Sequence, residues 1–110
     1  MNEDIAYLTD ILDRIRRIEV YTQTGRAEFF QSELLQDAVM RCFEVIGEAV
    51  KQLSPQVRQR YPDVPWRQIA GFRDVLIHDY RNVDLIEVWN TVSHDLPTLK
   101  QQINRARNEY

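Results

Sequence analysis

The sequence predicts an all-α protein, an up-and-down bundle of about four or five helices. Three observations lead to this prediction. Apolar residues recur at three- and four-residue steps along most of the chain, no segment shows the strict alternation of a β-strand, and serine, glycine and proline stand where the periodic segments would end. A chain of 110 residues is long enough for one core, so we expect a single domain over residues 1–110.

Two long amphipathic helices are predicted in the first half of the chain. The first extends from Ile5 to near Gly25, with its apolar residues on one face. The second covers residues 34–53, where Ser32 has the side chain of an N-cap and acidic residues occupy the opening turns. Cys42 lies among the apolar positions of this second helix, and we expect it to be a buried, reduced thiol.

A short helix and a longer one are predicted next. Ser54 and Pro55 close the second helix and can open a short one that stops before Pro62. A similar start signal at residues 64–66 opens the longer helix, whose apolar spacing extends towards Tyr80. A glycine, Gly71, interrupts this helix, and it marks either a bend or a close contact between helices.

The last predicted helix begins after residues 82–84 and reaches Pro97. Because proline cannot donate a backbone hydrogen bond and clashes with the preceding turn, the helix must kink or restart there. A weaker apolar stripe continues to Ala106 and ends in a polar tail.

The formal net charge is −3, and the acids are concentrated in the first half of the chain. Residues 1–50 hold 5 arginines against 10 acidic residues, whereas residues 51–110 hold 9 basic residues against 7 acidic ones. This charge balance argues against non-specific binding of duplex nucleic acid, which needs many phosphate contacts, but it permits a local phosphate site. We expect such a site near residues 58–81, where five arginines occur: Arg58, Arg60, Arg67, Arg73 and Arg81. For Arg58 and Arg60, exposure on a solvated surface is the commoner role.

The beginning of the chain does not have the pattern of a secretory signal. Two acids follow Met1 and Asn2, where such a signal needs basic residues, and no apolar run reaches membrane-spanning length. We therefore expect a cytoplasmic protein.

The chain has two histidines in different surroundings. His94 lies near an expected helix end, where an exposed surface histidine is the default interpretation. His78 stands between Arg73 and Tyr80, so a guanidinium, an imidazole and a phenol occupy one short stretch. This stretch is the candidate site.

Two roles are open for the acids beside His78. Asp74 lies four residues before it, close enough on a helix to orient the imidazole and to favour its protonated form. Asp74, His78 and Asp79 also offer ligands to a metal ion. Since the second histidine is sixteen residues away and no cysteine accompanies them, the metal site is the weaker hypothesis.

Helix geometry limits how the three motif side chains can meet. At 100° of rotation per residue, Arg73 and Tyr80 would point within about 20° of each other, whereas Arg73 and His78 diverge by about 140°. The three side chains converge if the long side chain of Arg73 extends around the helix, if the helix bends, or if a second copy of the helix packs alongside. A symmetric dimer would bring two copies of the pair to one groove.

The spacing Arg73-x4-His78-x-Tyr80 resembles the R-x4-H-x-Y motif of HepT-like proteins, a branch of the HEPN superfamily. Order and spacing are similar from about Ile5 to Leu99. The matching segments are Ile46-Gly47-Glu48-Ala49, Pro65-Trp66, Ile69-Ala70-Gly71, Val83-Asp84, Val88-Trp89 and Asp95-Leu96-Pro97. Asp74 takes a position often held by asparagine in such proteins, and it adds negative charge near the place where an RNA phosphate would bind.

The resemblance implies a HEPN-like homodimer that acts as a metal-independent endoribonuclease without a cofactor, from a cleft at the dimer interface. RNA supplies its own nucleophile, the 2′-hydroxyl, so the protein needs only a base and a cation. His78 titrates in the right range for the base. Arg73 is permanently charged and can fork onto two phosphate oxygens. The alternative is that Arg73 only pairs with nearby acids and that His78 is an exposed helix residue.

For Tyr80 the resemblance implies a regulatory role. Its counterpart in the family receives AMP from a partner, an MntA-like nucleotidyltransferase antitoxin, so the chain would be the toxin of a toxin-antitoxin system. A phosphate added beside Arg73 and His78 would occupy the anion site and block RNA. The alternative is a core tyrosine with its hydroxyl at the rim.

Two other functions stay open from the sequence. The bundle can be a binding module that has lost turnover and only docks a nucleotidyltransferase, which the charge of Asp74 favours. It can also be a regulatory domain that holds a nucleotide through Arg73 and neighbouring arginines without cutting RNA.

Overall fold

The chain folds into helices joined by short turns, and no strand occurs among residues 2–110, which the computed structural model describes. Met1, which belongs to the predicted domain of residues 1–110, lies outside the described residues. The all-α prediction is confirmed. In chain order the elements are α1 (Asn2–Tyr21), α2 (Arg26–Gln31), α3 (Glu33–Gln52), α4 (Pro55–Arg60), α5 (Trp66–His78), the 3-10 turn η1 (Tyr80–Asn82), α6 (Leu85–Asn90), the π-helical turn η2 (Thr91–Asp95) and α7 (Leu96–Asn108).

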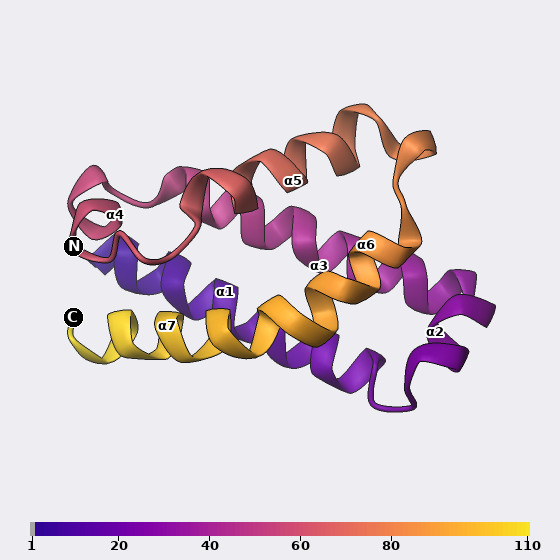
Figure 1. The fold of residues 1–110 in the computed structure, drawn as a ribbon. Coiled ribbons are helices and arrows are strands. Elements are labelled where there is room, and N and C mark those ends of the chain that lie inside the picture. Colours follow the sequence, from indigo (N-terminus) through magenta and orange to yellow (C-terminus); the bar gives the residue numbers. More distant parts are fainter. Residues whose placement is uncertain (1) are drawn as a thin grey trace.

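The long helical segments run up and down (Figure 1). α1, α3, α5 and the continuous segment from α6 to α7 alternate in direction, with α2 and α4 as short elements between them. α3 packs against both α1 and α5, and α7 returns along α1. The predicted up-and-down bundle is confirmed. α5 packs mainly on α3, so one side of it faces away from the rest of the bundle.

The core forms where the apolar faces of α1, α3 and α7 meet. The side chains without exposed surface include Leu8, Ile11, Ile15 and Ile18 from α1, Val39 and Ile46 from α3, and Ile103 and Ala106 from α7. Cys42 is a buried free thiol, as predicted, and burial raises its pKa. A thiol in such surroundings is unreactive. None of the helices within residues 2–110 combines the length and the hydropathy that a membrane-spanning helix requires.

Serine side chains fix two of the predicted helix starts. The Ser32 hydroxyl accepts a hydrogen bond from the Leu35 N–H at 3.1 Å, which caps α3. The Ser54 hydroxyl likewise accepts from the Val57 N–H at 3.4 Å and caps α4. Buried Asp4 accepts from the Ser54 N–H at 2.9 Å and from its hydroxyl at 2.7 Å, so the start of α1 is tied to the start of α4.

Before Pro97, where the sequence predicts a kink or a restart, the chain forms a π-helical turn. η2 lies directly before α7, and the backbone stays helical through it. Because proline has no N–H and crowds the previous turn, one wider turn accommodates it without ending the helix. The hydroxyls of Thr91 and Ser93 donate to the backbone oxygens of Glu87 at 2.9 Å and Trp89 at 3.0 Å.

Two details differ from the sequence prediction. α2 was not predicted; it places the buried ring of Phe29 against Phe30 and Trp89. The prediction of a bend or close contact at Gly71 is wrong, because α5 runs unbroken through it and a Cβ there would meet no atom within 4 Å. The close contact between helices occurs at Gly47 instead.

Candidate active site

Arg73 lies on the side of α5 that packs tightly against α3. Gly47 of α3 faces it: a Cβ on Gly47 would collide with the Cβ of Arg73 and stand 2.9 Å from its Cγ and 3.3 Å from the Ile69 oxygen. Only glycine allows this approach without moving α5. The Arg73 side chain is 21% exposed, and its Nε is buried without a hydrogen-bond partner among the described residues.

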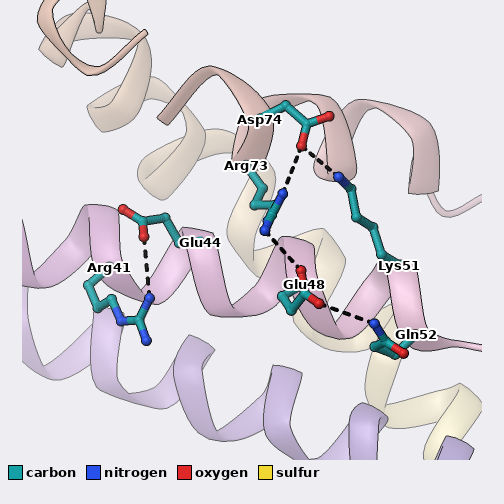
Figure 2. A network of polar contacts seen from close by, with 7 residues as sticks. All are labelled: Arg41, Glu44, Glu48, Lys51, Gln52, Arg73 and Asp74. Atoms are coloured by element: carbon teal, nitrogen blue, oxygen red, sulfur yellow. Dashed lines mark hydrogen bonds and ion pairs between the residues drawn. The ribbon is translucent and has the colours of Figure 1, made fainter. Parts of the chain in front are cut away.

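The guanidinium of Arg73 lies between two carboxylates (Figure 2). Its Nη2 is 3.1 Å from Glu48 Oε2, and its Nη1 donates to Asp74 Oδ1 at 3.0 Å. The same Asp74 oxygen accepts from Lys51 Nζ at 2.6 Å, and Gln52 Nε2 donates to Glu48 Oε1 at 3.1 Å. We call these five residues the α3–α5 network. Its two cations balance its two anions, and it links α5 to α3.

Asp74 is engaged by cations and not by the imidazole. Hydrogen bonds from Lys51, and then from Arg73, lower the pKa of its carboxyl. Within residues 2–110 no hydrogen bond joins Asp74 to His78. A role of Asp74 in orienting His78 stays a prediction.

His78 is the last residue of α5 and is exposed. Arg73 opens towards a groove of about 360 Å³ between α1, α3 and α5, and Tyr7, Glu44 and Ile77 line this groove with it. His78 is not among the lining residues. Because five helical positions turn the two side chains about 140° apart, a single chain does not aim Arg73 and His78 at one point.

Tyr80 does not continue the helix, so its predicted alignment with Arg73 on one helix face is wrong. α5 ends at His78 because Asp79 adopts φ −137° and ψ 42°, and Tyr80 begins η1. The Tyr80 hydroxyl donates to Asp37 at the start of α3 at 2.9 Å. This bond raises the pKa of the phenol, and the ring is 52% exposed, so a core role for Tyr80 is excluded.

The other polar candidates take ordinary places. Asp79 accepts from Asn82 at 2.7 Å, and no group of three or more potential metal ligands gathers within the described part of the chain. His94 is exposed as predicted, but it lies in η2 and not near a helix end. Arg60 lies over the rings of Tyr61 and Tyr110.

The partners of the motif on α3 were missed by sequence reasoning. The three- and four-residue spacing of Arg41, Glu44, Glu48 and Lys51 predicts, from sequence alone, that they pair with one another on one solvated face of the helix. Arg41 does pair with Glu44, at 3.3 Å, but Glu48 and Lys51 reach across to α5. The available signal was the glycine before Glu48, since a glycine inside a long helix often marks a close approach of another backbone.

Comparisons with known proteins agree on one family. The family model described as "Ribonuclease HepT-like" matches residues 11–106. A Methanocaldococcus jannaschii protein named "Gamma-glutamylcyclotransferase and putative RNase MJ0434" is 43% identical over 99% of this chain, but the chain covers only 50% of that protein. "Putative RNase MJ1216" of the same organism is 40% identical, over 91% of this chain and 84% of the relative.

A third relative is covered almost completely. The protein named "Probable ribonuclease HepT" of Thermococcus cleftensis is 40% identical over 92% of this chain and 93% of its own length. No solved structure matches the chain.

Proposed function

This chain belongs to the HepT-like ribonuclease family, and on that premise we propose that it is a metal-independent endoribonuclease with Arg73 and His78 as catalytic residues. One observation carries the proposal. The matched region contains an exposed histidine at the end of α5, five residues after an arginine whose side chain is partly exposed between α3 and α5. We further propose that residues 1–110 act as one domain.

The proposed reaction uses the 2′-hydroxyl of the RNA as nucleophile. The imidazole of His78 takes the proton of this hydroxyl while its oxygen forms a bond to phosphorus and the bond to the 5′-oxygen breaks. The leaving 5′-oxygen gains a proton, and the products are a cyclic phosphate and a free 5′-hydroxyl. Arg73 stabilises the negative charge that builds up on the phosphoryl oxygens.

The site is completed, in this proposal, by a second copy of the chain. One protomer directs Arg73 and His78 apart, whereas two copies of α5 around a twofold axis can place the arginine of one copy near the histidine of the other. Two imidazoles at one phosphate also divide the proton transfers, since one accepts the proton of the 2′-hydroxyl while the other donates one to the 5′-oxygen.

We also propose that the chain is the toxin of a toxin-antitoxin pair and that Tyr80 is its control point. The phenol is exposed at the start of η1, two residues after His78, so a partner nucleotidyltransferase can reach it. Transfer of AMP from ATP forms a bond between the phenol oxygen and the α-phosphorus, breaks the bond from that phosphorus to the oxygen that bridges to the β-phosphate, and releases pyrophosphate and the phenol proton. The added phosphate would compete with RNA for the cations of the site.

Cleavage of RNA by the purified protein tests the catalytic proposal. We expect cleavage with and without EDTA, and we expect His78→Ala to remove it without altering the circular dichroism spectrum. His94→Ala is the matched control, because it removes the other exposed histidine of the chain and should leave cleavage unchanged. Cleavage that survives in His78→Ala would disprove the assignment.

One observation favours a second candidate, a binding module without turnover. Both terminal nitrogens of Arg73 already contact carboxylates, those of Glu48 and Asp74. If they stay so engaged when RNA binds, the arginine cannot stabilise a phosphorane. The EDTA-resistant cleavage described above separates the two candidates, since an inactive docking module shows none.

A further inference from the structure

The α3–α5 network cannot by itself attract an anionic strand. Its two cations, Lys51 and Arg73, are matched by the carboxylates of Glu48 and Asp74. The whole chain carries a net charge of −3. Because RNA binding depends on cations that neutralise phosphates, the cations that hold the strand must lie beside the network and must be free of acidic partners.

Such cations line a groove next to the network. A groove of about 640 Å³ runs between α4 and the first half of α5, and its lining includes Arg58, Gln59, Arg67 and Asp74. In the described part of the chain, neither Arg58 nor Arg67 forms an ion pair. Asp74 is the single acid of this lining, and Lys51 and Arg73 neutralise it. Through Asp74 the groove is continuous with the network.

The wall of this groove contains a second, independent feature. Gly71 lies between Arg67 and Asp74 on the same face of α5, since these residues are spaced by four and three positions. Glycine inside a helix costs about 0.5 to 1 kcal/mol relative to alanine. No packing contact offsets this cost, because a Cβ at Gly71 would meet no atom within 4 Å. Its effect is to leave the helix backbone open to the groove.

We infer that the groove between α4 and α5 binds the backbone of a single RNA strand, with Arg58 and Arg67 each on a phosphate and with the strand passing close to Gly71. This inference rests on the proposed function, because the strand is the RNA that the motif would cut. It assigns to the groove a segment of substrate that flanks the cleaved bond. Contacts to phosphates hold a strand without reading its sequence.

The salt dependence of binding tests the two arginines. The probe is a short, fluorescently labelled oligouridine with 2′-O-methyl groups, which binds without being cut because it lacks the nucleophile. For single strands, the logarithm of the binding constant falls with the logarithm of salt concentration by about 0.7 for each phosphate contact. We expect the double variant R58Q/R67Q to bind more weakly, with a slope shallower by about 1.4.

The matched control removes the same charge elsewhere. R16Q/R26Q changes two exposed arginines of α1 and α2, neither of which forms an ion pair within residues 2–110. We expect its slope to equal that of the unmodified protein. Equal losses in the two double variants would show that only net charge matters, and the groove would then not be the binding site.

Gly71 gives a steric test with the charge unchanged. Gly71→Gln introduces a long, uncharged side chain that favours helix, so it should fill the groove without unfolding α5. We expect it to weaken binding of the oligonucleotide at least severalfold, whereas Ala6→Gln, which adds a glutamine at an exposed position of α1, should bind as the original does. Undiminished binding by Gly71→Gln would overturn the inference.

The results distinguish this inference from the proposed function. An unchanged slope in R58Q/R67Q, together with cleavage that depends on His78, overturns the groove and leaves the ribonuclease. A shallower slope without any cleavage of ordinary RNA supports the groove and overturns the ribonuclease. If the unmodified protein does not bind the oligonucleotide, or if the variants lose binding only because their oligomeric state changes in light scattering, the groove is not an RNA site.

Discussion

At the level of single residues, the guanidinium of Arg73 is oriented by carboxylates that a phosphate could replace. The carboxylates that contact it, those of Glu48 and Asp74, are about half exposed. Exposed ion pairs contribute little free energy, since water compensates each partner. A phosphate that displaces one carboxylate therefore exchanges one weak ion pair for a charge-assisted contact with two forked hydrogen bonds. The network keeps Arg73 oriented and lets it change partners at little cost.

The lowered pKa of Asp74 leads to a prediction about stability and pH. A carboxyl whose pKa is lower in the folded state stabilises the fold above its unfolded pKa, and this contribution disappears as the pH falls through the folded value. We expect Asp74→Asn to unfold more easily in urea than the original at neutral pH, with the difference vanishing in acid. Asp10→Asn is the control for the loss of one negative charge, because Asp10 is an exposed acid of α1 that forms no ion pair in the described chain. A difference that persists in acid would mean that the Lys51 and Arg73 contacts are not its cause.

The proposed regulation by AMP transfer predicts that Tyr80 is the modified residue. Co-expression with a cognate nucleotidyltransferase should add AMP to the chain, and Tyr80→Phe should abolish the mass shift while RNA cleavage continues, because the phenol takes no part in the reaction. Tyr110→Phe, which changes another exposed tyrosine, should still be modified. AMP found by mass spectrometry on a different tyrosine, or protection without any modification, would contradict this role of Tyr80.

At the level of helices, two glycines on facing elements should respond oppositely to the same change. Gly47→Ala forces a methyl group against the Arg73 side chain and the Ile69 oxygen, and overpacking of this kind destabilises by about 1 to 3 kcal/mol. Gly71→Ala meets open space and should stabilise the helix by about 0.5 to 1 kcal/mol. Urea unfolding measures both values. We expect Gly47→Ala also to reduce cleavage, because it displaces the helix that contains Arg73. Equal changes in the free energy of unfolding for the two variants would refute the close approach of α5 at Gly47.

The positions of the helices follow from local signals in the sequence. Ser32 and Ser54 cap the helices they were expected to cap, and a π-helical turn precedes Pro97, where a kink or a restart was expected. These signals succeed because the hydrogen bonds involved join residues three or four positions apart, which sequence order alone specifies. Periodicity likewise identifies the buried face of each long helix.

Features that depend on contacts between helices were not predictable in the same way. α2 has six residues, no side-chain cap and one buried ring, so its helical state depends on packing against α3 and Trp89. No glycine or proline follows His78 closely enough to predict that α5 ends there. The pairing of Glu48 and Lys51 with α5 joins residues more than twenty positions apart, and only the tertiary structure fixes it.

At the level of the whole molecule, the divergence of Arg73 and His78 predicts a homodimer. The surface beside them has the apolar character of an interface, because Val75 is 45% exposed and Ile77 is 41% exposed. We expect light scattering to show a dimer at micromolar concentration. Ile77→Asp should yield monomers without cleavage activity, whereas Val20→Asp, at a more exposed apolar position near the end of α1, should leave the dimer intact. A monomer that cleaves RNA would disprove the composite site.

The return of α7 along α1 has a consequence for rearranging the order of the chain. Arg107 donates to Thr9 at 2.8 Å, and Figure 1 places the start of α1 and the end of α7 at one end of the bundle, opposite the turn between α1 and α2. A short linker could therefore join Tyr110 to Asn2. New termini could be opened between Thr24 and Gly25, in the turn that separates α1 from α2, where Gly25 has a φ of 99°. Such a circular permutant should keep the helical spectrum and melting temperature of the original. In it α1 would follow α7 directly, so the native contact that spans almost the whole chain would become a local helical hairpin.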